Sequence, residues 1–157
     1  MPSRLESALA LRNFLMPRSN LWLRREALVV AFILFDYLST LAFCHAPYEE
    51  ANMFARAFME NFGITLGLTL FVFVSNMPIH MTLSLDSQII RLPSKIAFFF
   101  EVFVDAIFAW YVAGVHFNGG TSWFWFAPDS MRQTLGAALY LAAALSLVKP
   151  HKPNYDN

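Results

Sequence analysis

Four long apolar stretches constrain this chain more than any other feature of its sequence. They cover residues 27–46, 55–77, 96–117 and 131–148, and each approaches the ~20 residues that a helix needs to cross a bilayer. Charged residues make up 14% of the chain, whereas a soluble domain is nearer to ~25%. Because lipid cannot hydrogen-bond the backbone, stretches of this length form helices. The sequence therefore predicts an all-α, up-down-up-down bundle of four membrane-spanning helices, with residues 1–157 forming a single domain.

Turn-forming residues mark the expected ends of these helices. Pro47 follows the first stretch and Pro78 the second, and proline removes a backbone donor and breaks a helix. The run Asn118-Gly119-Gly120 follows the third stretch and is typical of a loop. We expect the second helix to begin before its apolar core, near Asn52, and residues 79–93 to lie as a loop along the membrane surface.

Basic residues are distributed unequally between the two predicted sides of the membrane. Of the 11 Lys and Arg residues, all but Arg56 and Arg132 fall in the N-terminal segment, the second loop and the C-terminal tail. Because loops rich in Lys and Arg stay in the cytoplasm, both termini are predicted to be cytoplasmic, in a protein of the plasma membrane. The Arg-bearing N-terminus also resembles a mitochondrial transit peptide, which leaves the mitochondrial inner membrane as an alternative.

Residues 4–16 are expected to form a short amphipathic helix on the membrane surface. Ser3 and Glu6 match a capping box, and four leucines and a phenylalanine follow at positions 5–15. The two arginines of this segment would then face lipid phosphates. A tail without regular structure is the alternative.

Three acidic residues lie within the apolar cores of these stretches, where an ionised side chain costs ~3 kcal/mol or more; the core of the second stretch is residues 62–77, which leaves Glu60 outside it. Asp36 is nine residues into the first stretch and Asp105 nine residues into the third, which predicts an equal depth of ~14 Å for both. Glu101 is one turn before Asp105 on the same helix face. These acids are therefore expected to form one acidic layer near the middle of the membrane.

Neutral polar residues are predicted at the same depth in the first, second and fourth stretches. They are Thr40 in the first, Thr65 and Thr69 in the second, and Tyr140 in the fourth. Lipid cannot satisfy such groups, so they should face the inside of the bundle. Together with the three acids they form a candidate site for an ion, a proton or a partner protein.

The apolar cores of these stretches, which exclude Arg56 and Arg132 at the outer ends of the second and fourth, contain no Lys or Arg to balance the three carboxylates. Three unpaired carboxylates cannot all remain ionised in a medium of low dielectric constant. They can be protonated and hydrogen-bonded, they can bind a proton or a metal cation, or they can pair with basic residues of a partner protein. The sequence leaves these three alternatives open.

A second cluster of ionisable residues is predicted at the outer membrane surface. His45 and His116 end the first and third stretches, and Glu49 and Glu50 lie in the short loop that follows the first. Imidazole and carboxylate groups together suit a divalent metal ion, although histidines exposed to solvent are the alternative. His116 is also three helical turns after Asp105, so a polar line, which would be a proton path or only an inward face, is expected between them.

Small residues recur at helical spacing in two of the stretches. Gly63 and Gly67 form a GxxxG pattern in the second, and Gly136, Ala138 and Ala142 form a strip in the fourth. Because small residues let helices approach closely, contacts within the bundle are expected at both places.

The run Asp36-Tyr-Leu-Ser-Thr40, followed by Glu50-Ala-Asn52, resembles a family of small, uncharacterised bacterial and archaeal membrane proteins. That family has Asp-x-x-x-Thr in its first span and Glu-Ala-Asn-Pro in the following loop. Met53 stands here in place of the proline. The resemblance covers about 20 residues, brings no activity with it, and implies only that Asp36, Thr40, Glu50 and Asn52 act together in the outer half of the bundle.

Three functions remain open on the sequence alone. No Ser-His-Asp, HExxH or Gly-rich phosphate motif is present, and the single Cys44 excludes a CxxC pair, so we expect no catalytic activity of its own. The first hypothesis is an accessory or structural subunit of a larger membrane complex, with lipids and other membrane subunits as partners and no nucleic acid. The alternative is a small proton- or cation-coupled transporter or channel component that uses Asp36, Glu101 and Asp105. The third is an intramembrane metalloenzyme, for which a divalent metal ion is the cofactor.

Overall fold

The computed structural model describes residues 20–89 and 93–147, and this part of the chain is all-helical, at 87% helix with no strand. The predicted all-α class is confirmed. The predicted surface helix at residues 4–16 lies outside the described residues, as does the side chain of Glu101.

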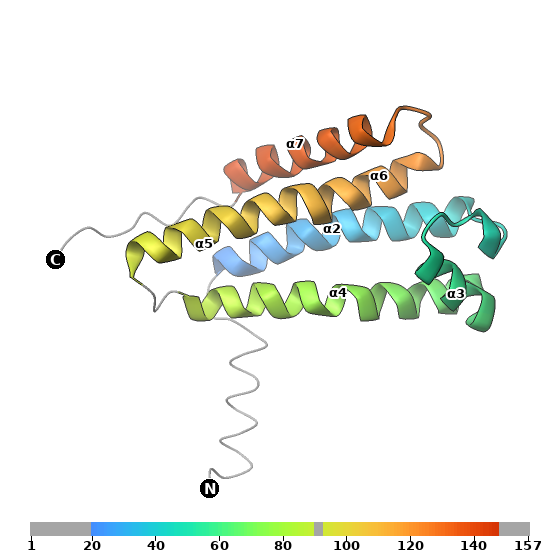
Figure 1. The fold of residues 1–157 in the computed structure, drawn as a ribbon, viewed down its shortest axis with the longest axis horizontal. Helices are drawn as coiled ribbons and strands as arrows, with labels where there is room; N and C mark the ends of the chain where they lie inside the picture. Colours follow the sequence, from blue (N-terminus) through green and yellow to red (C-terminus); the bar gives the residue numbers. More distant parts are fainter. Residues whose placement is uncertain (1–19, 90–92, 148–157) are drawn as a thin grey trace, which may run out of the picture.

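The helices follow one another with short connections (Figure 1). Two runs of helix, α2 and the continuous run α5, η2 and α6, point in one direction, and α4 and α7 point in the other. The bounds of the elements are α2 Asn20–Phe43, η1 Pro47–Glu49, α3 Met53–Phe62, α4 Ile64–Ile89, α5 Ser94–Ile107, η2 Phe108–Gly114, α6 Val115–Ser122 and α7 Asp129–Leu147.

Three helices of the described chain are long and apolar enough to cross a membrane. The segments are Arg24–Phe43, Ile64–Met81 and Val102–Ser122. The 19 residues of α7 do not qualify, because its first turns contain Asp129, Arg132 and Gln133 and lower its mean hydropathy. The fourth predicted span therefore stays a prediction.

The first predicted span has different bounds in the structure. α2 already begins at Asn20, and it ends at Phe43 rather than at Ala46. The chain leaves the helix through Cys44, whose Sγ donates to the carbonyl oxygen of Ala46 at 3.3 Å. The earlier start matters, because it places Arg25 on a helix that the sequence pattern had begun at residue 27.

The second span was expected to be one continuous helix, but the structure shows a helical hairpin. Gly63 has φ +80° and ψ 161°, a region that is essentially restricted to glycine, and it separates α3 from α4. α3 then packs back against the start of α4 at Gly67, where a Cβ atom would lie 2.3 Å from the carbonyl oxygen of Phe58. The GxxxG pattern thus provides one chain reversal and one close helix contact.

Pro78 lies inside α4 and does not end it, so the expected loop at residues 79–93 is wrong for its first 11 residues. α4 continues to Ile89. Proline removes one backbone donor, and in an apolar helix the remaining backbone bonds on either side hold the helix together.

The expected end of the third span at Asn118-Gly119-Gly120 is also wrong, because α6 continues to Ser122. Both glycines contact α2. A Cβ atom at Gly119 would lie 2.6 Å from Asp36 Oδ1, and one at Gly120 would lie 2.6 Å from Cε1 of Phe35. These glycines are therefore a packing surface for α2 and not a turn.

The helices pack as two groups that share α2. α2, η2, α6 and α7 pack on one another around an apolar core that includes Val29, Phe108 and Tyr140, while α4 has its main contacts with α2 and α3. Of the predicted strip of small residues on α7, Gly136 allows close approach, since a Cβ atom there would lie 2.4 Å from Cβ of Phe117. Ala138 and Ala142 of the same strip are exposed. The two groups leave a space between α4 and α6, on one side of α2.

Candidate functional site

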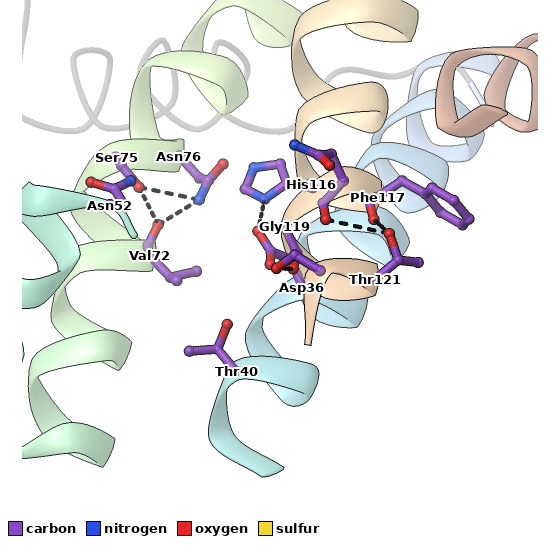
Figure 2. Close-up of polar contacts among 12 residues, drawn as sticks. Asp36, Thr40, Asn52, Val72, Ser75, Asn76, His116, Phe117, Gly119 and Thr121 are labelled. Carbon is purple, nitrogen blue, oxygen red and sulfur yellow. Dashed lines mark hydrogen bonds and ion pairs between the residues drawn. The ribbon is translucent and has the colours of Figure 1, made fainter. Parts of the chain in front are cut away.

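A cavity of about 440 Å³ occupies this space and is covered by the loop between α2 and α3. Figure 2 shows its polar walls, with Ser75 and Asn76 of α4 on one side and Asp36 and His116 on the other. The cavity is lined by polar or ionisable side chains from every surrounding element: Asp36, Tyr37, Thr40, Glu49, Glu50, Asn52, Ser75, Asn76, His116, Asn118, Ser122, Trp123, Asp129 and Arg132.

Asp36 and His116 form a pair on the wall of this cavity. Asp36 Oδ2 and His116 Nδ1 are 2.8 Å apart, and the two side chains are 24% and 21% exposed. The contact requires α6 to approach α2 closely, which Gly119 permits (Figure 2). When the carboxyl group is ionised, it accepts a hydrogen bond from Nδ1–H of the imidazole.

The wall formed by α4 is polar through two adjacent residues. Asn76 donates from its amide nitrogen to the carbonyl oxygen of Val72 at 2.8 Å, and the Ser75 hydroxyl donates to the same oxygen at 3.4 Å. These bonds within the helix turn hold both side chains at the surface of the cavity. A polar α4 thus faces the Asp36–His116 pair (Figure 2).

The loop above the cavity is held by its own polar residues. Asn52 caps α3, since its side chain accepts from the backbone N–H groups of Phe54 and Ala55 at 3.0 and 3.3 Å. The guanidinium group of Arg56 donates to the carbonyl oxygen of Glu50 at 2.6 and 3.0 Å. The loop is therefore a folded cover whose position is fixed relative to α3.

The carboxylate of Glu50 lies under this cover. Burial raises its pKa above 4.5, and the negative charge of Asp36 acts in the same direction, although a hydrogen bond from the Asn52 backbone at 2.8 Å opposes them. The cavity thus holds two carboxylates that influence each other, and one of them is partly desolvated.

Arg132 contributes a buried guanidinium group to the same cavity, and its donors are engaged within the chain. It donates to the side chain of Asn118 at 2.7 Å, to the carbonyl oxygens of Trp125 and Ala127 at 2.6 Å each, and to the carboxylate of Asp129. These bonds fix the connection between α6 and α7. Sequence analysis had treated Arg132 only as a charge outside the membrane.

Five of the candidate residues meet in the cavity. They come from both clusters that the sequence had suggested, the membrane layer and the surface cluster: Asp36, Thr40, Glu49, Glu50 and His116. Thr40 is buried and accepts from the indole nitrogen of Trp123 at 3.2 Å. Together with Asn52, these include all four residues that the resemblance had implied to act together.

The two threonines predicted in the second span lie outside the cavity. Thr69 is 2.9 Å from the hydroxyl of Tyr37 and donates to the carbonyl oxygen of Thr65 at 2.7 Å. Thr65 itself is exposed. Tyr37 does line the cavity, so Thr69 influences the cavity only by its hydrogen bond to the Tyr37 hydroxyl.

Asp105 is also outside the cavity, and the expectation that no basic group of this chain reaches it is wrong. Arg25 Nε is 3.0 Å from Asp105 Oδ1, and Arg25 Nη2 donates to Oδ2 at 3.2 Å. The contact is therefore an ion pair with one hydrogen bond and a second close approach of opposite charges. Tyr140 of α7 is fully buried in the core beside this pair.

The expected equal depth of Asp36 and Asp105 is wrong as well. Arg25–Asp105 and Asp36–His116 both join residues 80 positions apart, so α2 and the α5–α6 helix lie in one register over both pairs. The two aspartates are therefore three turns apart, or ~16 Å along α2. Asp105 and His116, the two ends of the expected polar line, both contact α2. The residues between them include the π-helical turns of η2, so the spacing of a regular α-helix does not apply there.

His80 and Glu26 form a further contact between α4 and α2, which the sequence did not predict. His80 Nδ1 lies within hydrogen-bonding distance of Glu26 Oε1. His80 had been assigned to a loop and Glu26 to a flank of the first span, because proline and charge were taken as helix ends. The continuation of α4 past Pro78 was the missing information.

The residues proposed for a divalent metal are not gathered around one point. His45 is exposed and does not line the cavity, and its backbone N–H donates to Glu49 Oε2 at 2.7 Å. Backbone hydrogen bonds from His45 and Ala46 lower the pKa of Glu49. In the described part of the chain, no group of three His, Cys, Asp or Glu side chains is placed to hold a metal ion.

Comparisons of this chain with protein-family models, with curated proteins and with solved structures give no match. The resemblance noted above therefore rests on its few residues, and the function has to be argued from the cavity itself.

Proposed function

We propose that this protein is a small proton-coupled membrane transport protein, or the conducting component of one. Its solute site is the cavity between α2, α4 and α6, and its proton-exchanging group is the Asp36–His116 pair. The observation that carries the proposal is the placement of this pair, 2.8 Å apart, on the wall of a polar cavity of about 440 Å³.

The pair lies within helices that are apolar enough to cross a membrane. Asp36 belongs to the segment Arg24–Phe43 and His116 to Val102–Ser122. Ionisable residues inside such segments are costly, and they commonly face a water-filled cavity and mark an ion or proton pathway. Histidine is suited to this role because its charge changes in the physiological pH range.

Asp36 rather than Asp105 is the acid assigned to transport. Asp105 is held by Arg25 outside the cavity, whereas Asp36 faces the cavity with a titratable partner. The hypothesis of an accessory subunit rested in part on buried acids that a partner protein could satisfy. Because this chain supplies its own partners for Asp36 and Asp105, that part of its support is lost, and we favour transport.

The proposal includes the predicted topology. We place α7 as a fourth span, since Gly136 and Tyr140 are buried against the other helices, and both termini in the cytoplasm. The cavity then opens toward the outside of the plasma membrane, beneath the loop that contains Glu50. A solute would enter from that side and meet Asp36 about halfway through the membrane.

The test is proton flux in liposomes that contain the purified protein and a trapped pH-sensitive dye, driven by a potassium diffusion potential. We expect flux above that of empty liposomes for the natural protein. Asp36→Asn and His116→Gln should each remove most of it. Glu60→Gln is the matched control, because Glu60 is an exposed carboxylate on α3 that does not line the cavity.

Two results would contradict the proposal. One is natural protein that conducts no better than empty liposomes. The other is unchanged flux in both Asp36→Asn and His116→Gln. Asp105→Asn separates transport from folding, since protein that still folds with this change should keep its flux.

A further inference from the structure

We propose that the solute of this cavity is a small organic cation, bound through its ammonium group by the carboxylates of Asp36 and Glu50 and by the rings of Tyr37, Phe71 and Trp123. This inference rests on the proposed function, which places the solute in the cavity. It adds the chemical class of the solute and the residues that select it.

The charge of the lining favours a cation. Four carboxylates line the cavity, from Asp36, Glu49, Glu50 and Asp129, against the guanidinium group of Arg132 and the imidazole of His116. Arg132 is already bound to Asp129 and to three oxygen atoms of the α6–α7 region. His116 is bound to Asp36. An anionic solute would therefore meet no disengaged positive group among these lining residues, and it would be repelled by the carboxylates.

Glu50 gains most from a positive solute. Its carboxylate is the one that burial disfavours in the charged form, with Asp36 adding a like charge. An ammonium group between the two would offset both effects, because opposite charges attract more strongly where water is excluded. The positive charge of Arg56 opposes these effects only in part, so the cover loop places a carboxylate that a cationic solute would stabilise further.

Three aromatic rings line the same space, and two of them are fixed by hydrogen bonds to other helices. The indole N–H of Trp123 donates to Thr40, and the hydroxyl of Tyr37 is bonded to Thr69. Phe71 packs against Phe58, with ring centroids 5.9 Å apart. Aromatic faces attract ammonium groups, and rings that are already fixed lose little freedom when a cation binds.

The size of the cavity and its ligand set argue for an organic cation rather than a bare metal ion. A volume of about 440 Å³ lies within the ~300–1,000 Å³ that is usual for sites of small organic molecules. A metal ion needs several ligands converging at ~2–2.6 Å, and the described residues provide no group of three that could do so.

The experiment measures binding of radiolabelled choline to the purified full-length protein in mild detergent. Unlabelled choline and its neutral isostere 3,3-dimethyl-1-butanol serve as competitors. We expect saturable binding, with the isostere weaker than choline by about tenfold or more, since it lacks only the positive charge. Asp36→Asn and Glu50→Gln should each weaken choline binding by about tenfold or more, whereas Glu60→Gln should leave it unchanged.

Three results would overturn the inference: no saturable choline binding, equal competition by choline and its isostere, or unchanged affinity in both cavity variants. Equal competition would instead assign the cavity to neutral polar solutes. Glu50→Gln keeps the test valid if Asp36→Asn does not fold. Proton flux without choline binding would contradict this inference and leave the proposed transport function standing. Choline binding without proton flux would contradict the proposed transport function and leave the cation site standing.

Discussion

Asp36 and Asp105 are the same residue type on parallel apolar helices, yet the bundle gives them different surroundings. Asp105 forms an ion pair with the guanidinium group of Arg25, which donates one hydrogen bond to it and approaches it closely with a second nitrogen. Asp36 faces a cavity and a histidine. We therefore assign Asp105 to stability and Asp36 to function, and the two assignments predict different behaviour on mutation.

Asp105→Asn should destabilise the protein by roughly 2–3 kcal/mol, because it leaves the 5%-exposed side chain of Arg25 without its carboxylate. The value is below that of a fully buried pair, since the side chain of Asp105 is 35% exposed. Thermal unfolding in detergent measures the effect. The double variant Arg25→Met/Asp105→Leu should be more stable than the sum of the two single changes predicts, and simple additivity would contradict a direct pair.

Glu50 carries a prediction for the pH dependence of stability. A carboxyl group whose pKa is raised by folding binds its proton more tightly in the folded state, so stability falls as the pH rises above 4.5. Glu50→Gln cannot ionise and its side-chain oxygen can still accept from the Asn52 backbone. It should therefore be the more stable protein near neutral pH and lose this advantage at about pH 4.

The measurement is the melting temperature of both proteins across this pH range. Glu60→Gln is the control, because Glu60 is exposed on the same short helix. If Glu50→Gln melts below the natural protein near neutral pH, the prediction is wrong, and the attraction of Arg56 for the Glu50 carboxylate outweighs the cost of burial.

At the scale of the elements, the hairpin of α3 and α4 depends on one residue. Gly63 has a backbone conformation that costs other residues about 1–3 kcal/mol, and no atom lies within 4 Å of the position where a Cβ would be. The reversal is therefore a requirement of the backbone and not of packing. It allows α3 to carry the loop that covers the cavity.

Gly63→Ala should lower the free energy of unfolding by about 1–3 kcal/mol, through backbone strain alone. Thermal unfolding in detergent tests this value, with Asn61→Ala two residues earlier as the control. A loss well under 1 kcal/mol would mean that α3 and α4 can join into a single helix without harm. Choline binding should weaken in that case, because the cover loop would move with α3.

The errors of sequence analysis concern these same elements. Apolar composition identified where the helices are, because the length of a spanning helix is set by the membrane. It could not identify where they end, since Pro78 and Gly119 usually mark ends but here lie inside helices. Gly119 contacts Asp36 on another helix, and a single sequence carries no information on that contact.

The wrong ends also explain the wrong depths in the candidate site. Counting from residue 96 placed Asp105 at the level of Asp36, whereas the segment fit to cross a membrane begins at Val102. The polar residues themselves were found, because polar groups in an apolar stretch are conspicuous. Which of them meet, and the pairing of Asp105 with Arg25, depended on the register between helices.

At the scale of the whole molecule, the orientation in the membrane can be tested with single cysteines in a Cys44→Ala background. Tyr48 and Phe126 are 73% and 94% exposed and belong to the α2–α3 and α6–α7 connections, which lie at the same end of the bundle (Figure 1). The proposed topology predicts that a cysteine at either position reacts with a membrane-impermeant maleimide in intact cells, since loops rich in Lys and Arg stay in the cytoplasm. A cysteine at Ser3 should react only after lysis.

The reverse labelling pattern would indicate the opposite orientation in the membrane, with the cavity open to the cytoplasm. Reaction of all three cysteines from outside would mean that α2 does not separate Ser3 from Tyr48, which would contradict the proposed topology. With the reverse pattern, the cavity and its pairs would remain as described, and only the side from which a solute enters would change.

The shared register of Arg25–Asp105 and Asp36–His116 has a mechanical consequence. A slide of α2 along the α5–α6 helix by one turn would break both pairs at once, so these helices, with α7, form a frame that resists shearing. α4 has its main contacts with α2 and α3. We therefore expect the cavity to open by a joint movement of α3 and α4, which breaks the Tyr37–Thr69 and Glu26–His80 contacts with α2 but leaves Asp36 and His116 in place.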